Sequence, residues 1–243
     1  MMRQLSVIYL AALLTVPSLA QTSPAAPPTK LMDAKPAAKG LSLAETAKFI
    51  EEKMNGQGQI GWVFTTSSLQ GISTQTYYQI SDTQLDAGTC TLTTRETTNY
   101  LIQPAVGITY SEGGKPVTAE NLRRRELALS VTPLKQVVSV KVESADEAII
   151  RGNARAGRPD ITTEVTPPIY LMILMTSGKD SKFHRELNRG EEAPKIWDED
   201  ADSNRYTFRE KELADQVASA FQHAVELCGG NEGTGEEGPA ARK

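Results

Sequence analysis

The chain is poor in the residue types that build most catalytic centres. Its 243 residues include two histidines and two cysteines, and aromatic residues make up 6%. A zinc site built on histidine usually draws on more histidines or on closely spaced cysteines. The sequence also has no G-x-S-x-G elbow, the pattern typical of α/β-hydrolases. We therefore predict no catalytic residue and favour a protein that is not an enzyme.

An excess of positive charge is also absent. The formal net charge is −4, which gives no general attraction to nucleic acid or to anionic lipid. The densest basic run, Arg123–Arg125, is flanked by Glu120 and Glu126. We expect no nucleic-acid partner.

Long apolar runs are scarce, and the longest lies near the start of the chain. Leu5–Val16 is apolar except at two positions, follows the positive charge of Arg3 and ends at Pro17. Ser18 and Ala20 place small residues at the two positions that a signal peptidase reads. A membrane-spanning helix needs about 20 apolar residues, so this run is too short for an anchor. We predict that residues 1–20 form a secretory signal peptide, that the protein is secreted or periplasmic, and that no transmembrane segment remains after cleavage.

The rest of the chain divides by composition. Residues 21–40 are rich in alanine and proline, so we expect a flexible tether. Residues 231–243 are rich in glycine and glutamate, so we expect a disordered tail. Between them, residues 41–230 are long enough for a single domain with a sizeable core.

Two cysteines, Cys90 and Cys228, lie in the predicted domain. In an oxidising compartment an even pair favours a disulfide, which here would join an early strand to the end of the last helix. The alternative is a redox-active or metal-binding pair, but those chemistries favour close spacing such as C-x-x-C, which is absent. We predict a structural disulfide, which contributes at most about 5 kcal/mol in the chain-entropy model.

Helices are expected at both ends of the domain. Ser42 and Glu45 have the S-x-x-E spacing of a capping box, an apolar stripe follows at helical spacing, and Gly56 is placed to end the helix. The closing helix, from about Arg209 to Leu227, carries a second apolar stripe that should be buried against a sheet.

The region between the helices is rich in strands. Apolar and polar residues alternate in most of it, as in strands with one buried face, and the apolar run at 169–175 is typical of a strand buried on both faces. The expected strands are 60–66, 76–81, 90–98, 127–131, 138–142, 149–150, 161–165, 169–175 and 206–208. The charged segment Lys179–Arg189 is expected to be an exposed loop. Because helices do not interleave the strands, we predict an α+β fold, a curved or partly closed antiparallel sheet with an N-terminal and a C-terminal helix packed on it.

The end of the chain resembles the end of other secreted proteins. Ala220–Gly230, with the sequence AFQHAVELCGG, is similar to the last helix of uncharacterised secreted proteins of environmental bacteria. The order of a last strand and a long helix is also similar in outline to pleckstrin-homology-like barrels. Neither resemblance implies an activity, because one fold hosts many functions.

A glycine motif follows the first expected helix. Gly56, Gly58 and Gly61 have the spacing of a dinucleotide-binding fingerprint. That mechanism needs a strand before the glycines and a helix after them, and here the order is reversed. We interpret the glycines as a helix stop and a turn, and we expect no organic cofactor.

Oxygen-bearing side chains alternate before the last expected strand, as at the start of a calcium loop: Asp198, Asp200, Asp202 and Asn204. The glycine and the glutamate that an EF-hand needs further along are missing. The alternative is an acidic, solvated turn. Calcium is therefore the one cofactor that we keep as a candidate.

Trp197 lies between Pro194 and this acidic segment and is a candidate contact residue. With no catalytic motif, we predict a non-enzymatic binding or interaction module of the bacterial envelope, with an envelope protein as the expected kind of partner. The alternatives are an extracytoplasmic hydrolase that uses two carboxylates and a calcium-dependent adhesion or stability module.

Overall fold

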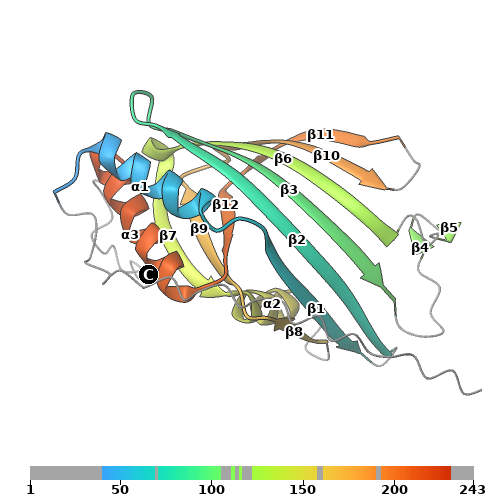
Figure 1. Ribbon diagram of the computed structural model, residues 1–243. Helices are drawn as coiled ribbons and strands as arrows, with labels where there is room; N and C mark the ends of the chain where they lie inside the picture. The colour runs from blue at the N-terminus through green and yellow to red at the C-terminus, as the bar shows by residue number, and fades with distance from the viewer. Residues whose placement is uncertain are drawn as a thin grey trace, which may run out of the picture. The chain divides into compact units, whose positions relative to one another are not determined.

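Long antiparallel strands dominate the computed structural model of the chain (Figure 1). The structure describes residues 40–68, 71–104, 111–112, 115–116, 122–157, 161–189 and 193–230. All of these belong to one unit of the chain, Lys35–Lys243. The predicted signal peptide, the predicted tail and all but the last residue of the predicted tether lie outside the described residues, so they stay predictions.

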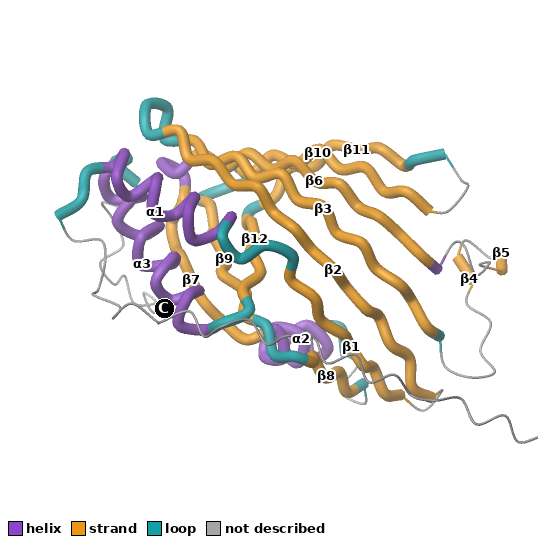
Figure 2. Tube along the Cα trace, viewed as in Figure 1, coloured by secondary structure: helices purple, strands orange, loops and turns teal. Residues whose placement is uncertain are grey.

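The larger sheet has seven strands, and every neighbouring pair is antiparallel. Its long central strands curve along their length (Figure 2). From edge to edge the strands are β11 (Lys195–Ala201), β10 (Ser181–Arg189), β6 (Arg123–Pro133), β3 (Thr91–Gln103), β2 (Gly71–Asp86), β1 (Ile60–Ser68) and β8 (Thr162–Thr166). Because successive side chains of a strand point to opposite faces, every second residue of each strand faces the concave side.

A smaller sheet of three strands faces this concave side. Its order is β12 (Ser203–Phe208), β9 (Tyr170–Thr176) and β7 (Val137–Ser144), and η2 (Leu134–Gln136) leads into β7. The chain passes from one sheet to the other five times: at η2, between β7 and β8, at residues 167–169, at residues 177–180 and at Asp202. The described strands therefore form two separate sheets and not a closed barrel. A short ribbon of β4 (Ser111–Glu112) and β5 (Lys115–Pro116) belongs to neither sheet.

The two predicted helices lie side by side at one end of the sheets (Figure 1). α1 (Leu43–Asn55) begins at the predicted capping box, in which Ser42 and Glu45 each bind the other's backbone N–H. α3 (Lys211–Leu227) buries its apolar stripe against the smaller sheet. The main core between the helices and the sheets includes the fully buried side chains of Ile50, Leu92, Leu134, Met172, Leu174, Phe208 and Phe221. The predicted fold class is confirmed.

A disulfide closes this helical end. It joins Cys90, in the turn after β2, to Cys228, at the end of α3, with the two Cα atoms 5.9 Å apart. Both sulfurs belong to the main core. The predicted pairing is confirmed, and it ties the larger sheet to the last helix across 138 residues of sequence.

One predicted strand was wrong. Residues 149–150 lie in α2 (Ala145–Arg155), a helix that the sequence analysis did not predict. Ser144 and Glu147 form a second capping box at its start. This S-x-x-E signal fixes the first turn, and the local preference of two isoleucines for a strand does not outweigh it.

The predicted loop at Lys179–Arg189 was also wrong, because β10 fills Ser181–Arg189. Its Phe183 and Leu187 are buried, and charged side chains alternate with them. The acidic segment after it is likewise the edge strand β11 and not a turn. An edge strand tolerates charge because one side of it meets solvent, so its composition hides the strand.

Candidate functional site

A cavity of about 430 Å³ lies between the concave face of the larger sheet and strand β12. The alternation of side chains along the strands brings polar residues of four neighbouring strands into its walls, among them Gln79 from β2, Glu96 from β3, Glu126 from β6 and Arg185 from β10. The register of the strands brings these residues together. Gln79 pairs with Thr98, which follows Glu96 by two residues on β3. Arg185 pairs with Ala128, which follows Glu126 by two residues on β6. The cavity wall is thus assembled from strands far apart in sequence.

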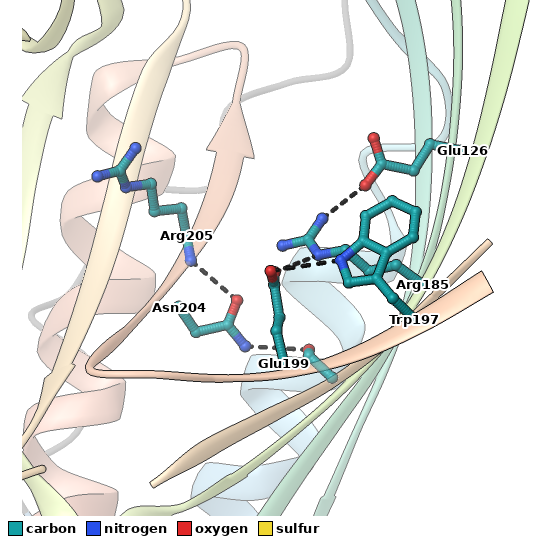
Figure 3. A network of polar contacts seen from close by, with 7 residues as sticks. Glu126, Arg185, Trp197, Glu199, Asn204 and Arg205 are labelled. Atoms are coloured by element: carbon teal, nitrogen blue, oxygen red, sulfur yellow. Dashed lines mark hydrogen bonds and ion pairs between the residues drawn. The ribbon is translucent and has the colours of Figure 1, made fainter. Parts of the chain in front are cut away.

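Arg185 is held by two carboxylates (Figure 3). Its Nη1 donates to Oε1 of Glu126 at 2.6 Å, and its Nε donates to Oε1 of Glu199 at 2.5 Å. Burial opposes the charge of Arg185, but the hydrogen bonds to both carboxylates outweigh it, so the pKa of the guanidinium lies above its usual value. The Trp197 indole also donates to Glu199, at 3.4 Å. This network fixes the cavity wall near the edge of the sheet.

Glu96 has a different environment. Burial raises the pKa of its carboxyl above the usual value of 4.5, and hydrogen bonds from Gln79 and Thr98 and the charge of Arg185 oppose the rise only in part. The charge of Glu126 adds to it. The Thr98 hydroxyl lies 3.2 Å from Oε1 of Glu96. Glu96 therefore keeps its proton to a higher pH than an exposed glutamate does.

A buried polar network joins the two sheets beside the cavity. Nδ2 of Asn204, on β12, lies within hydrogen-bond distance of the hydroxyls of Ser130 (3.0 Å), Thr132 (3.2 Å) and Tyr206 (2.7 Å). All four residues are buried, and burial raises the pKa of the Tyr206 hydroxyl, which stays neutral. The network holds β12 at a fixed position opposite β6, and so sets the width of the cavity.

Aromatic rings form a row along one wall. The rings of Trp62 and Tyr77 are stacked with centroids 5.2 Å apart, and Tyr77 stacks in turn on Tyr100 at 5.2 Å. Phe64 contacts both Trp62 and Tyr77 edge to face, so these rings form one packed cluster.

Two polar atoms of this wall are buried without a hydrogen-bond partner among the described residues. They are Nε1 of Trp62 and Oε1 of Gln79, on side chains that are 7% and 5% exposed. Both side chains line the cavity. An unsatisfied buried polar group costs about 1–3 kcal/mol, so each of these atoms requires an explanation, such as strain or a bound water, ion or ligand.

The predicted calcium ligands are not brought to one point. Asp198 and Asp200 lie on the face of β11 away from the cavity, where they pair with His184 at 2.7 Å and with Lys182 at 2.8 Å. Asp202 occupies the bend between the sheets, and Asn204 is buried in the network described above. Within the described ranges no group of three or more His, Cys, Asp or Glu side chains is placed to hold a metal ion. The calcium site stays a prediction.

Trp197 lies on the same face of β11 as Glu199, next to the cavity, and is half-exposed. The ammonium group of Lys195 sits over its ring at 5.3 Å. Its role as a contact residue stays a prediction.

Sequence reasoning missed Gln79, Glu96, Glu126 and Arg185. The available signal was weak: on β3 and β6 polar residues occupy every second position, where a core-facing strand would carry apolar ones.

No helix among the described residues is long and apolar enough to cross a membrane. Comparison with protein-family models, with curated proteins and with solved structures gives no match. The two resemblances drawn from the end of the sequence therefore stay predictions.

Proposed function

We propose that the protein is a non-enzymatic binding module of the bacterial envelope, secreted or periplasmic, which takes a small polar molecule into the cavity beneath its larger sheet. Its volume of about 430 Å³ is within the range of small-molecule sites, about 300–1,000 Å³. The Cys90–Cys228 disulfide supports a compartment outside the reducing cytoplasm.

The observation that carries the proposal is the pair of buried atoms without partners, Nε1 of Trp62 and Oε1 of Gln79. One is a donor and the other an acceptor. A ligand with an acceptor for Trp62 and a donor for Gln79 would recover the free energy that each unsatisfied group costs. Neither atom contributes to holding the sheets together, whereas the neighbouring Asn204 network is satisfied within the protein.

The test is a screen of small ring compounds that carry hydroxyl, amide or amine groups, followed by variants of the two orphan atoms. Trp62→Phe removes the indole donor and keeps an aromatic ring, and Gln79→Met removes the amide at similar length. We expect each to weaken the compounds that bind by about three- to tenfold, as measured by NMR titration. Tyr78→Phe is the matched control, since Tyr78 lies next to Gln79 on β2 but on the convex face.

Equal binding by wild type, Trp62→Phe and Gln79→Met would show that the compounds bind elsewhere. A screen in which no compound binds would overturn the proposal itself.

A second candidate is a hydrolase that uses carboxylates, favoured by one observation. Glu96 and Glu126 line the same cavity, one with a raised pKa and the other ion-paired with Arg185. Two acids in different environments are the arrangement that glycosidases use. Turnover of chromogenic aryl glycosides by the wild type, lost in Glu96→Gln, would favour the enzyme. The binding proposal predicts no turnover by either protein.

A further inference from the structure

Glu96 faces the cavity without a cation of its own. Among the described residues it forms no ion pair, and its hydrogen bonds come from Gln79 and Thr98. The charge of Arg185 acts on Glu96 from a distance, but its guanidinium is already paired with Glu126 and Glu199. Of the two acidic side chains that line the cavity, Glu126 has an ion pair among the described residues and Glu96 has none.

The acceptors also lie together. Gln79 and Glu96 line the same wall on neighbouring strands, and Oε1 of Gln79 is a buried acceptor without a partner among the described residues. The carboxyl of Glu96 and this amide oxygen thus form a pair of adjacent acceptors in one wall of the cavity. An ammonium group has three donors and no acceptor, so it can satisfy both at once. A neutral hydroxyl has one donor and can satisfy one of them.

We propose that the ligand of this cavity is a small amine, whose ammonium group donates to the carboxylate of Glu96 and to Oε1 of Gln79. The inference rests on the proposed binding function and adds the charge of the ligand to it. The indole N–H of Trp62, on the neighbouring strand, then takes an acceptor elsewhere on the same molecule, such as a hydroxyl or carbonyl oxygen.

The proposal also fixes how binding depends on pH. A carboxyl with a raised pKa must lose its proton to pair with the cation, so the preference for an amine grows as the pH rises through that pKa. The groups that face Glu96 are Glu126 from β6, Arg185 from β10 and Tyr206 from β12, and β2 contributes the neutral Gln79. Arg185 stays charged and Tyr206 stays neutral at acid and neutral pH, since both have a raised pKa.

Three probes of matched shape test the charge of the ligand: 2-phenylethylamine, 2-phenylethanol and phenylacetate. The dissociation constant of each is measured at neutral pH from the indole N–H resonance of Trp62 in the full-length mature protein. We expect the amine to bind about tenfold more tightly than the alcohol, and phenylacetate to bind most weakly. Glu96→Gln should lower the affinity for the amine to that for the alcohol. Asp82→Asn, which removes a charge from the convex face of β2, should leave the ratio unchanged.

Failure of the inference and failure of the proposed function give different results. If the alcohol or the carboxylate shifts the Trp62 resonance at the same concentration as the amine, or at a lower one, the cavity binds ligands but not by the charge of Glu96. If none of the three shifts it at millimolar concentration, the binding function falls as well.

Should Glu96→Gln fail to fold, the wild type alone decides. The ratio of amine to alcohol affinity should shrink between about pH 8 and about pH 4, and a constant ratio would overturn the inference.

Discussion

The β2–β3 hairpin serves two different environments within a few residues. Near its turn, Leu85 pairs with Leu92, and both are buried in the core under the helices. Further along the same face, Gln79 and Glu96 line the cavity. The strands, their register and the face are the same, and only the side chains differ. The fold therefore places its main hydrophobic core at the helical end and the polar cavity further along the same strands, beside a second, smaller apolar cluster around Trp62 and Val165.

The two regions contribute to the stability of the fold with opposite sign. Around Phe221 and Cys228 the helices, the smaller sheet and the disulfide bury apolar groups whose removal from water stabilises the fold. The cavity instead buries a carboxyl and two polar atoms without partners, each of which lowers stability. Substitutions at the helical end should therefore change mainly stability, and substitutions in the cavity should change mainly binding.

The largest effect is expected in the core. Phe221 is fully buried and stacks on Tyr206 with ring centroids 6.3 Å apart. Phe221→Ala should lower the free energy of unfolding by about 3–5 kcal/mol, measured by urea denaturation, because it leaves a cavity. Ile150→Ala, at an exposed position of α2, is the control and should change it by less than about 0.5 kcal/mol. A loss below about 1 kcal/mol for Phe221→Ala would contradict the account of the helical end.

The disulfide should have the next largest effect. Replacing both Cys90 and Cys228 by alanine should cost about 2–5 kcal/mol in the same assay, because the unfolded chain gains freedom over a long loop. Binding of 2-phenylethylamine by the folded variant should not change, since the disulfide lies at the other end of the hairpin. A loss of binding without a loss of stability would break the separation of the two regions.

The smallest effect is expected at Glu96, and it depends on pH. Its folded-state pKa is raised, so the folded protein binds more protons than the unfolded chain between the two pKa values, and stability falls as the pH rises through this interval. Below the unfolded pKa the penalty is absent. Glu96→Gln should therefore be more stable than the wild type at about pH 7 and gain less at about pH 4, measured by denaturation at both. An equal difference in stability at both pH values would show that the pKa of Glu96 is not raised in the folded protein.

Local signals predicted the fold better than the site. The capping box at Ser42 and the apolar stripes located α1 and α3, and alternation located most strands. Charged residues on β10 and β11 hid two strands. Strands near the edge of a sheet expose much of their surface to solvent, so charged side chains interrupt the apolar alternation that identifies a strand.

The site could not be predicted because Glu96, Glu126 and Arg185 meet only through the register of neighbouring strands. A shift of one residue in that register would turn each of them to the convex face. Sequence patterns around each residue do not contain this information. The disulfide was predictable because only one pairing of two cysteines exists.

The central claim, that the polar cavity is a binding site, is tested most directly by a high-resolution crystal structure of the mature protein soaked with 2-phenylethylamine. We predict that the amine occupies the cavity, with its nitrogen within hydrogen-bond distance of Glu96 and of Oε1 of Gln79. A structure in which the cavity is closed, with Nε1 of Trp62 and Oε1 of Gln79 bonded to groups of the protein itself, would contradict the claim.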